Sequence, residues 1–90
     1  MPCNKFELGQ IVATRGIHEL LDRSAISVLL ARHVSGDWGD LGEEDKALND
    51  AALLSGQDRI FSSYCTPLGK VWIITEYDHS ATTILLPSEY

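Results

Sequence analysis

The sequence lacks the features that define several large classes of protein. It contains no run of about 18 apolar residues, so no transmembrane helix is expected. The N-terminal residues MPCNKFELGQ lack a basic stretch followed by an apolar core, which argues against a signal peptide and for a cytoplasmic location. The two cysteines, Cys3 and Cys65, form no CxxC pair, and no His and Cys cluster has zinc-finger spacing. We therefore expect reduced thiols and no structural zinc site.

Basic residues are also scarce. Seven Lys and Arg stand against 13 Asp and Glu, which gives a formal net charge of −6. Because contacts to phosphate need Lys or Arg, neither direct DNA binding nor attachment to an anionic membrane is expected. The charge favours a basic protein partner, such as a nucleic-acid-binding enzyme, although solubility alone also accounts for it. The absence of Walker, GxGxxG, GxSxG and HExxH motifs predicts no cofactor.

The residues that are present predict a single α+β domain over residues 1–90. It has an N-terminal strand, two to three helices and then a three-stranded antiparallel meander, with the helices packed on one face. The predicted strands are one within Phe6–Thr14 and three at Arg59–Cys65, Lys70–Glu76 and Ala81–Leu86. A short helix is predicted at Ile17–Arg23, followed by a helix from Ala25 that has Ser24 as its N-cap and ends at Gly36. A further helix is predicted from about Gly42 to Ser55, with an apolar stripe of Leu48, Ala51, Ala52 and Leu53.

The strand Lys70–Glu76 is apolar on both faces, because Trp72 and Ile74 alternate with Val71 and Ile73. One face is expected to carry the helices. The other is either covered by the N-terminal segment or forms an exposed patch for a protein partner or a homodimer.

The segment His33 to Lys46, HVSGDWGDLGEEDK, has two interpretations. Its acids, Asp37, Asp40, Glu43, Glu44 and Asp45, are oxygen ligands suited to Ca²⁺ or Mg²⁺. An EF-hand counted from Asp37 fails, because Gly39, Leu41 and Leu48 occupy ligand positions. The alternative is a connection between helices, in which Asp40 caps the second helix and the next acids occupy its first turn, while Trp38 and Leu41 fold back onto the core. This interpretation predicts no metal site and leaves Asp37 unexplained.

A second group of polar residues is expected at one end of the meander. With Thr66–Gly69 as the hairpin loop, Cys65 faces Lys70 and Arg59 faces Glu76, and the next turn places His79 near that end. Glu76 as base, His79 as acid and Arg59 as phosphate clamp would suit a ribonuclease. A surface ion pair and a solvated histidine explain the same residues. His18 and His33 are expected at the boundary between the apolar and polar faces of amphipathic helices.

Three stretches resemble a family of small bacterial proteins of unknown function that accompany plasmids and other mobile elements: ARHVSGDWGDLGEEDKALND, RIFSSY and GKVWIITEYDHSATTILLPSEY. Some members are labelled plasmid-related or as a type I restriction subunit. The resemblance covers nearly the whole chain and implies a genomic setting, with no catalytic residue to transfer. The closing meander also resembles, at the level of fold only, the sheet of barnase- and RelE-type ribonucleases.

We therefore hypothesise a small acidic protein-binding module, encoded by a mobile element, that inhibits a host defence or nucleic-acid-processing enzyme as anti-restriction or anti-CRISPR proteins do. A ribonuclease of barnase or RelE type, or an inactive relative, is the alternative. The predicted partner-binding residues are Asp37, Trp38, Asp40, Glu43, Glu44 and Asp45, with Trp38 as anchor if its ring is exposed.

Overall fold

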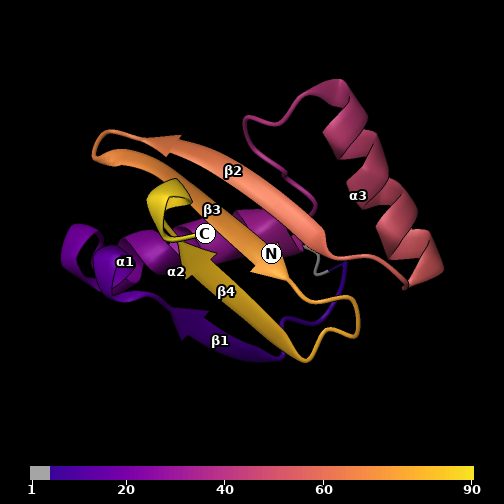
Figure 1. Cartoon of the computed structure of the whole chain (residues 1–90), viewed down its shortest axis with the longest axis horizontal. Coiled ribbons are helices and arrows are strands. Elements are labelled where there is room, and N and C mark those ends of the chain that lie inside the picture. Colours follow the sequence, from indigo (N-terminus) through magenta and orange to yellow (C-terminus); the bar gives the residue numbers. More distant parts are fainter. Residues whose placement is uncertain (1–4) are drawn as a thin grey trace.

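The computed structural model describes residues 5–90, which fold into three α-helices, four strands and one short 3-10 helix (Figure 1). Cys3 lies outside the described residues. In chain order the elements are β1 (Gln10–Ala13), α1 (Arg15–Leu20), α2 (Arg23–Val34), α3 (Glu43–Ser55), β2 (Ile60–Thr66), β3 (Gly69–Thr75), β4 (Ala81–Leu85) and η1 (Pro87–Glu89). The predicted α+β class is confirmed. No helix within residues 5–90 has both the length and the apolar character needed to cross a bilayer.

The four strands form one sheet in the order β1-β4-β3-β2. The last three strands form the predicted antiparallel meander, and the hairpin register places Cys65 opposite Lys70 as expected. The N-terminal strand joins this meander as its fourth member, parallel to β4, with Gln10 beside Ala81. It therefore extends the sheet sideways and does not cover the second face of the meander.

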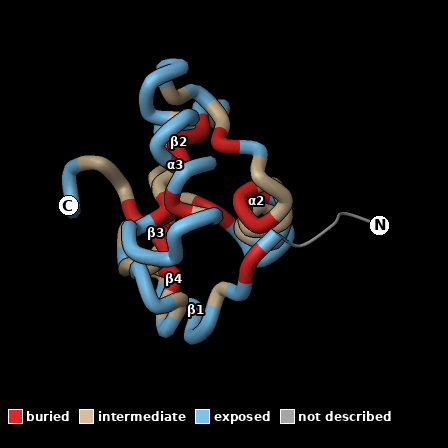
Figure 2. The backbone as a smooth tube through the Cα atoms, turned by 90° about the vertical axis from the view of Figure 1, so that its right-hand side faces the viewer, coloured by how far each residue is buried: buried red, intermediate tan, exposed pale blue. Residues whose placement is uncertain are grey.

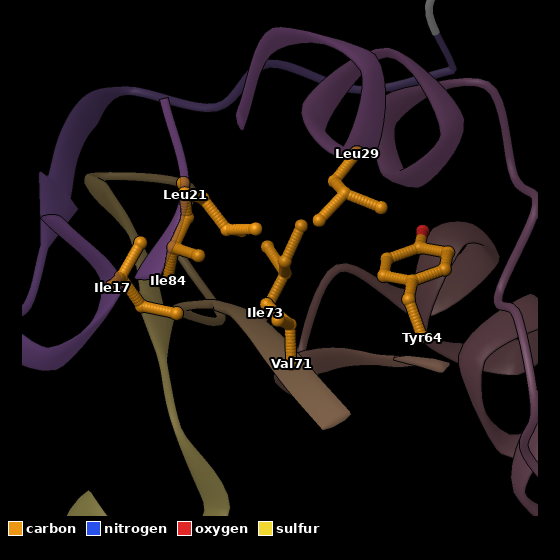
Figure 3. Close-up of a cluster of buried hydrophobic side chains, with 7 residues drawn as sticks. All are labelled: Ile17, Leu21, Leu29, Tyr64, Val71, Ile73 and Ile84. Carbon is orange, nitrogen blue, oxygen red and sulfur yellow. The ribbon is translucent and has the colours of Figure 1, made fainter. Parts of the chain in front are cut away.

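Helices α1 and α2 cover one face of the sheet, and Figure 3 shows the core between them. Leu29 projects from α2 toward Ile73 of β3, while Ile17 of α1 packs near Ile84 of β4. Side chains at alternate positions of each strand supply the rest of this core, as the period of a strand requires. Figure 2 shows α2 on one side of the sheet and the C-terminal segment on the other. We call these the helix face and the outer face.

Helix α2 begins two residues earlier than a helix with Ser24 as its N-cap would. Asp22 is the N-cap, and its Oδ1 accepts a hydrogen bond from the Ala25 N–H at 2.8 Å. The other end agrees with prediction. Gly36, at φ +89°, donates to the His33 carbonyl, and Asp37 N–H donates to the Arg32 carbonyl. These two bonds form a Schellman motif, which ends the helix and satisfies its last carbonyls.

Helix α3 has its three acids in the first turn and ends at Gly56, as expected. Its apolar stripe was predicted only in part, because Ala52 is buried and Leu53 packs against the core as expected, but Leu48 and Ala51 do not. Leu48 is 66% exposed and Ala51 is also exposed, whereas the buried residues of α3 are Asn49 and Ala52. The helix is rotated so that a polar residue points inward, because α3 lies beside the edge of β2 rather than flat on the sheet (Figure 1).

Asn49 binds the outward-facing backbone of Phe61 through both ends of its amide. Its Nδ2 donates to the Phe61 carbonyl at 2.6 Å, and its Oδ1 accepts from the Phe61 N–H at 3.1 Å. The side chain thus supplies the pair of hydrogen bonds that a neighbouring strand would give. This pair attaches α3 to the sheet and explains why Asn49 is only 4% exposed.

Substitution of Asn49 by Ala is expected to lower the free energy of unfolding by about 2–3 kcal/mol, because two buried backbone groups lose their partners. Glu44→Ala, on the exposed side of the same helix, is the control and should change stability by less than ~0.5 kcal/mol. Urea denaturation of both variants measures the difference. Equal effects would show that the Asn49 amide does not hold α3 in place.

Candidate functional site

The acidic segment runs along the outer edge of β2. Gly39 forms a parallel bridge with Ser63. The Ser63 N–H donates to the Trp38 carbonyl at 3.2 Å, and its carbonyl accepts from the Asp40 N–H at 2.6 Å. The Asp40 carboxylate then accepts from the Cys65 N–H at 2.8 Å. Asp40 therefore binds β2 and does not cap α3, whose N-cap is Gly42 with no side-chain bond.

Asp37, which the sequence left unexplained, holds the corner of this segment. Its carboxylate accepts from Arg32 Nε at 2.7 Å and from the Gly39 N–H at 3.2 Å. The hydrogen bond from Arg32 is the main reason why the pKa of Asp37 lies below its usual value. The Asp37 carbonyl accepts from the Tyr64 hydroxyl at 2.6 Å, and the Arg32 guanidinium lies 4.5 Å from the Tyr64 ring centre. Both the side chain and the backbone of Asp37 have structural partners.

Trp38 points inward and is only 4% exposed. Its ring stacks beside Phe6 and meets His33 edge-on, and its Nε1 donates to Asp50 at 3.1 Å. A buried ring cannot serve as the exposed anchor that the sequence hypothesis required. Trp38 instead fixes the corner between α2 and α3.

The remaining acids, Glu43, Glu44 and Asp45, are exposed on the first turn of α3. Only Glu43 has a basic neighbour, Lys46, at 3.9 Å. Within residues 5–90, no group of three or more His, Cys, Asp or Glu side chains is arranged to hold a metal ion. The six predicted partner-binding residues therefore divide into three with structural roles and three that remain free on the surface.

Cys65 is a free, exposed thiol beside Asp40. The neighbouring Asp40 carboxylate raises the pKa of the thiol, first by accepting its hydrogen bond and then by repelling a thiolate. This position suits an unreactive surface cysteine.

Arg59, Glu76 and His79 do not form one cleft. Since Ile60 pairs with Thr75, the register continues with Arg59 beside Glu76, as predicted. The Arg59 guanidinium, however, donates to the Tyr90 hydroxyl at 3.2 Å on the outer face. The His79 ring packs 5.5 Å from that of Phe6, a ring that also contacts His33 on the helix face. The ring of the predicted acid, His79, thus packs toward the helix face, away from the Arg59 guanidinium on the outer face.

His33 was predicted at a boundary but is fully buried beneath α2. Its Nδ1 bonds to the Ser62 hydroxyl and its Nε2 lies 2.9 Å from Thr75 Oγ1. Thr75 Oγ1 is 2.8 Å from Thr82 Oγ1, which donates to the Leu8 carbonyl at 2.7 Å. The spacing of His33 from Leu29 already placed it on the apolar stripe of α2 and was the signal for its burial.

The chain of bonds fixes the protonation of His33. Thr82 gives its one hydroxyl proton to Leu8, so it accepts from Thr75, and Thr75 in turn accepts from the imidazole. Nε2 therefore carries the proton and Nδ1 accepts from Ser62. Burial lowers the pKa of His33 to about 3, because a charged imidazole would be desolvated there. The ring is neutral and has no access to a substrate.

An open groove lies on the outer face of the sheet, between α3 and the C-terminal residue. It encloses about 560 Å³ and continues into a smaller hollow that shares Leu48, Arg59 and Phe61. We call this surface the α3 groove. Its lining residues are Leu41, Asp45, Leu48, Asn49, Ala51, Asp58, Arg59, Phe61, Trp72, Ile74 and Tyr90.

Three aromatic rings form the apolar side of the α3 groove. Phe61 and Trp72 meet edge-on at 5.1 Å, and Trp72 meets Tyr90 in the same way at 5.7 Å. Tyr90 is held over the sheet by η1, where the Glu89 carboxylate accepts from Thr14 Oγ1 at 2.6 Å. The hydrogen bond to Tyr90 also raises the pKa of Arg59, which stays charged at the groove wall.

Comparison with known proteins found no matching family model, curated protein or solved structure. The likeness to proteins of mobile elements therefore stays a prediction. The candidate site rests on the geometry of the α3 groove.

Gly39→Ala is expected to destabilise the protein by about 2 kcal/mol or more. At φ +74° the residue lies in the left-handed region, and an added Cβ would overlap the Ser63 carbonyl oxygen. Gly42→Ala, in the same segment, is the matched control, since no atom lies within 4 Å of its added Cβ. Thermal unfolding of the two variants compares the costs. Similar losses would contradict the close contact between this segment and β2.

The free energy of unfolding should also decrease as the pH is lowered, because of His33. The pKa of the ring is about 3 in the folded state and 6.5 as its ordinary value, so the unfolded chain takes up the proton first. The contribution is complete above pH 6.5 and declines as pH falls toward 3, at a limiting slope of ~1.4 kcal/mol per pH unit. Urea denaturation between pH 7 and about 4.5 measures it before the carboxylates titrate.

His33→Gln should be less stable at neutral pH and should lose most of this slope. The control is His18→Gln, which changes an exposed histidine on α1 and should keep the slope. An unchanged slope in His33→Gln would mean that another group is responsible for the loss of stability in acid.

Proposed function

We propose that this protein is an acidic protein-binding module, and that the α3 groove receives a segment of a partner protein with both apolar and basic side chains. The observation that carries the proposal is the apolar groove on the outer face of the sheet, between α3 and Tyr90. There Phe61, Trp72 and Ile74 line a groove with the exposed Leu48 at its rim. Concave apolar surfaces with a few polar groups at the rim are typical of binding sites.

The apolar part of the α3 groove supports a protein ligand. Its aromatic side chains are of the types that supply most of the binding energy at protein interfaces. Leu48 is 66% exposed and Tyr90 70% exposed, so a docked segment would remove both from water. Burial of these residues would add to binding without unfolding any part of the core.

The charge around the α3 groove supports a basic partner. The chain from Glu43 to Arg59 contains five acidic and two basic residues. Asp45 and Asp58 lie in the groove itself, while Glu43 and Glu44 extend the negative surface along α3. Such a surface repels phosphate, so it argues against nucleic acid and favours a Lys- or Arg-bearing protein segment.

The basic partner is proposed to be an enzyme that handles nucleic acid. A basic segment that contacts an acidic module is common on proteins that handle nucleic acid, since they need positive surfaces. Together with the sequence likeness to mobile-element proteins, this favours an inhibitor of a host defence or nucleic-acid-processing enzyme in the cytoplasm. The module would act by covering the basic surface that the enzyme uses for its own substrate.

Expression of the protein in bacteria that carry a type I restriction system or a CRISPR effector tests the proposal. Establishment of an unmodified, targeted plasmid should rise by at least about tenfold, because a covered enzyme cannot bind DNA. Leu48→Asp should abolish the rise, since it places a charge in the apolar groove.

Leu54→Asp is the matched control, because Leu54 is 92% exposed on the same helix and does not line the groove. It should behave as wild type. Direct binding of each purified effector to wild type and to both variants accompanies the assay. The inhibitor proposal fails if no effector binds and plasmid establishment is unchanged. If an effector binds equally well to Leu48→Asp, the contact lies outside the α3 groove.

A further inference from the structure

The two edges of the sheet differ in how their backbone groups are satisfied. On β2 the outward N–H groups of Phe61, Ser63 and Cys65 bind Asn49, Trp38 and Asp40, as described above. At β1, the Gln10 N–H donates to the carbonyl of Ser80, just before β4, and the Thr14 N–H donates to the carbonyl of Ile84 in β4. Alternation along a strand turns the N–H and C=O groups of Ile11 and Ala13 the other way, away from the sheet. Within residues 5–90 these outward groups have no hydrogen-bond partner.

The side chains at this edge are also open. Ile11 is 49% exposed and Val12 42% exposed, both on a strand whose four residues, QIVA, carry no charge. Natural sheets commonly protect an edge with Lys, Pro, a bulge or a covering element. None of these lies on β1 itself, and Figure 1 shows β1 along the margin of the sheet. The strand therefore presents both the backbone and the side chains that a further strand would need.

We propose that β1 pairs in antiparallel fashion with β1 of a second copy of this chain. A two-fold axis through Val12 would place Ile11 of each copy opposite Ala13 of the other. Each such pair exchanges two N–H···O=C bonds, so the four outward groups on each copy are all satisfied. The two Val12 side chains then lie opposite one another on the outer face, where β-branched pairs stabilise a sheet.

Charge at the ends of β1 favours this direction of pairing and a second copy as the occupant. Exposed Glu7 precedes the strand, and exposed Arg15, whose Nε lies 3.3 Å from Glu19 Oε1 of the same helix, follows it. Antiparallel pairing brings the Glu7 end of one copy beside the Arg15 end of the other, whereas parallel pairing would bring like charges together. The edge is thus complementary to itself in backbone and in charge.

The pairing has a consequence for the whole molecule. It joins two four-stranded sheets into one of eight strands and leaves the outer face of both copies on the same side. The two α3 grooves, each at the far edge of its sheet, would then face a partner together. Only two residue pairs per interface exchange hydrogen bonds, so the dimer is expected to be weak and reversible. The inference does not depend on the proposed function, because β1 takes no part in the α3 groove.

Sedimentation velocity over a series of protein concentrations, combined with amide exchange measured by NMR, tests the pairing. Wild type should pass from monomer to dimer as concentration rises. The Ile11 and Ala13 amides should become protected in parallel, while the Gln10 and Thr14 amides, already bonded within the chain, serve as internal references.

Ile11→Lys should weaken the dimer by roughly tenfold or more, since each dimer contains the charge twice. Leu54→Lys, the same kind of change at an exposed site on α3, should leave it intact. A monomer at all concentrations overturns the proposal. So does a dimer in which the Ile11 and Ala13 amides stay unprotected, because the contact would then lie elsewhere. This second result needs no variant and is read on the wild-type protein.

Discussion

The outer edge of β2 is the constraint on which the arrangement of this protein depends. An edge strand presents N–H and C=O groups that must find partners if they are removed from water. Here Asn49 supplies both partners for Phe61, and the segment around Gly39 supplies them for Ser63. These bonds fix the position of α3 and of the acidic segment relative to the sheet. The α3 groove exists because α3 is held beside the edge, so that the outer face stays open.

Polar groups also organise the helix face. A hydrogen-bonded chain from Ser62 through His33, Thr75 and Thr82 to the Leu8 carbonyl links α2, three strands and the N-terminal segment. Each group in it is satisfied, so the chain costs little by being buried and specifies one register between helix and sheet. It also couples folding to pH. The bonded pair of His33 and Ser62 has a structural role, because both side chains are fully buried.

Much of the local structure could be predicted. The end of α2 at Gly36, the end of α3 at Gly56 and the register of the β2–β3 hairpin depend on residues close in sequence, and these predictions are confirmed. The candidate site was predicted only in part. Glu43 to Asp45 are exposed as expected, whereas Trp38 is buried and Asp40 binds Cys65. The groove itself was foreseen only as a second apolar face on the strand that carries Trp72, with no indication that α3 would form its wall.

The sequence by itself determined the class of fold, the ends of the helices, the pairing of the meander and the negative charge. Each of these depends on neighbours along the chain or on composition alone. Only the tertiary structure decided which polar residues are buried. Asn and His are buried only where their polar atoms find hydrogen-bond partners, and those partners are distant in sequence. His33 finds Thr75 at a separation of 42 residues. Hydrogen-bond partners so distant in sequence come together only when the sheet forms. The position of the α3 groove also depends on these long-range contacts.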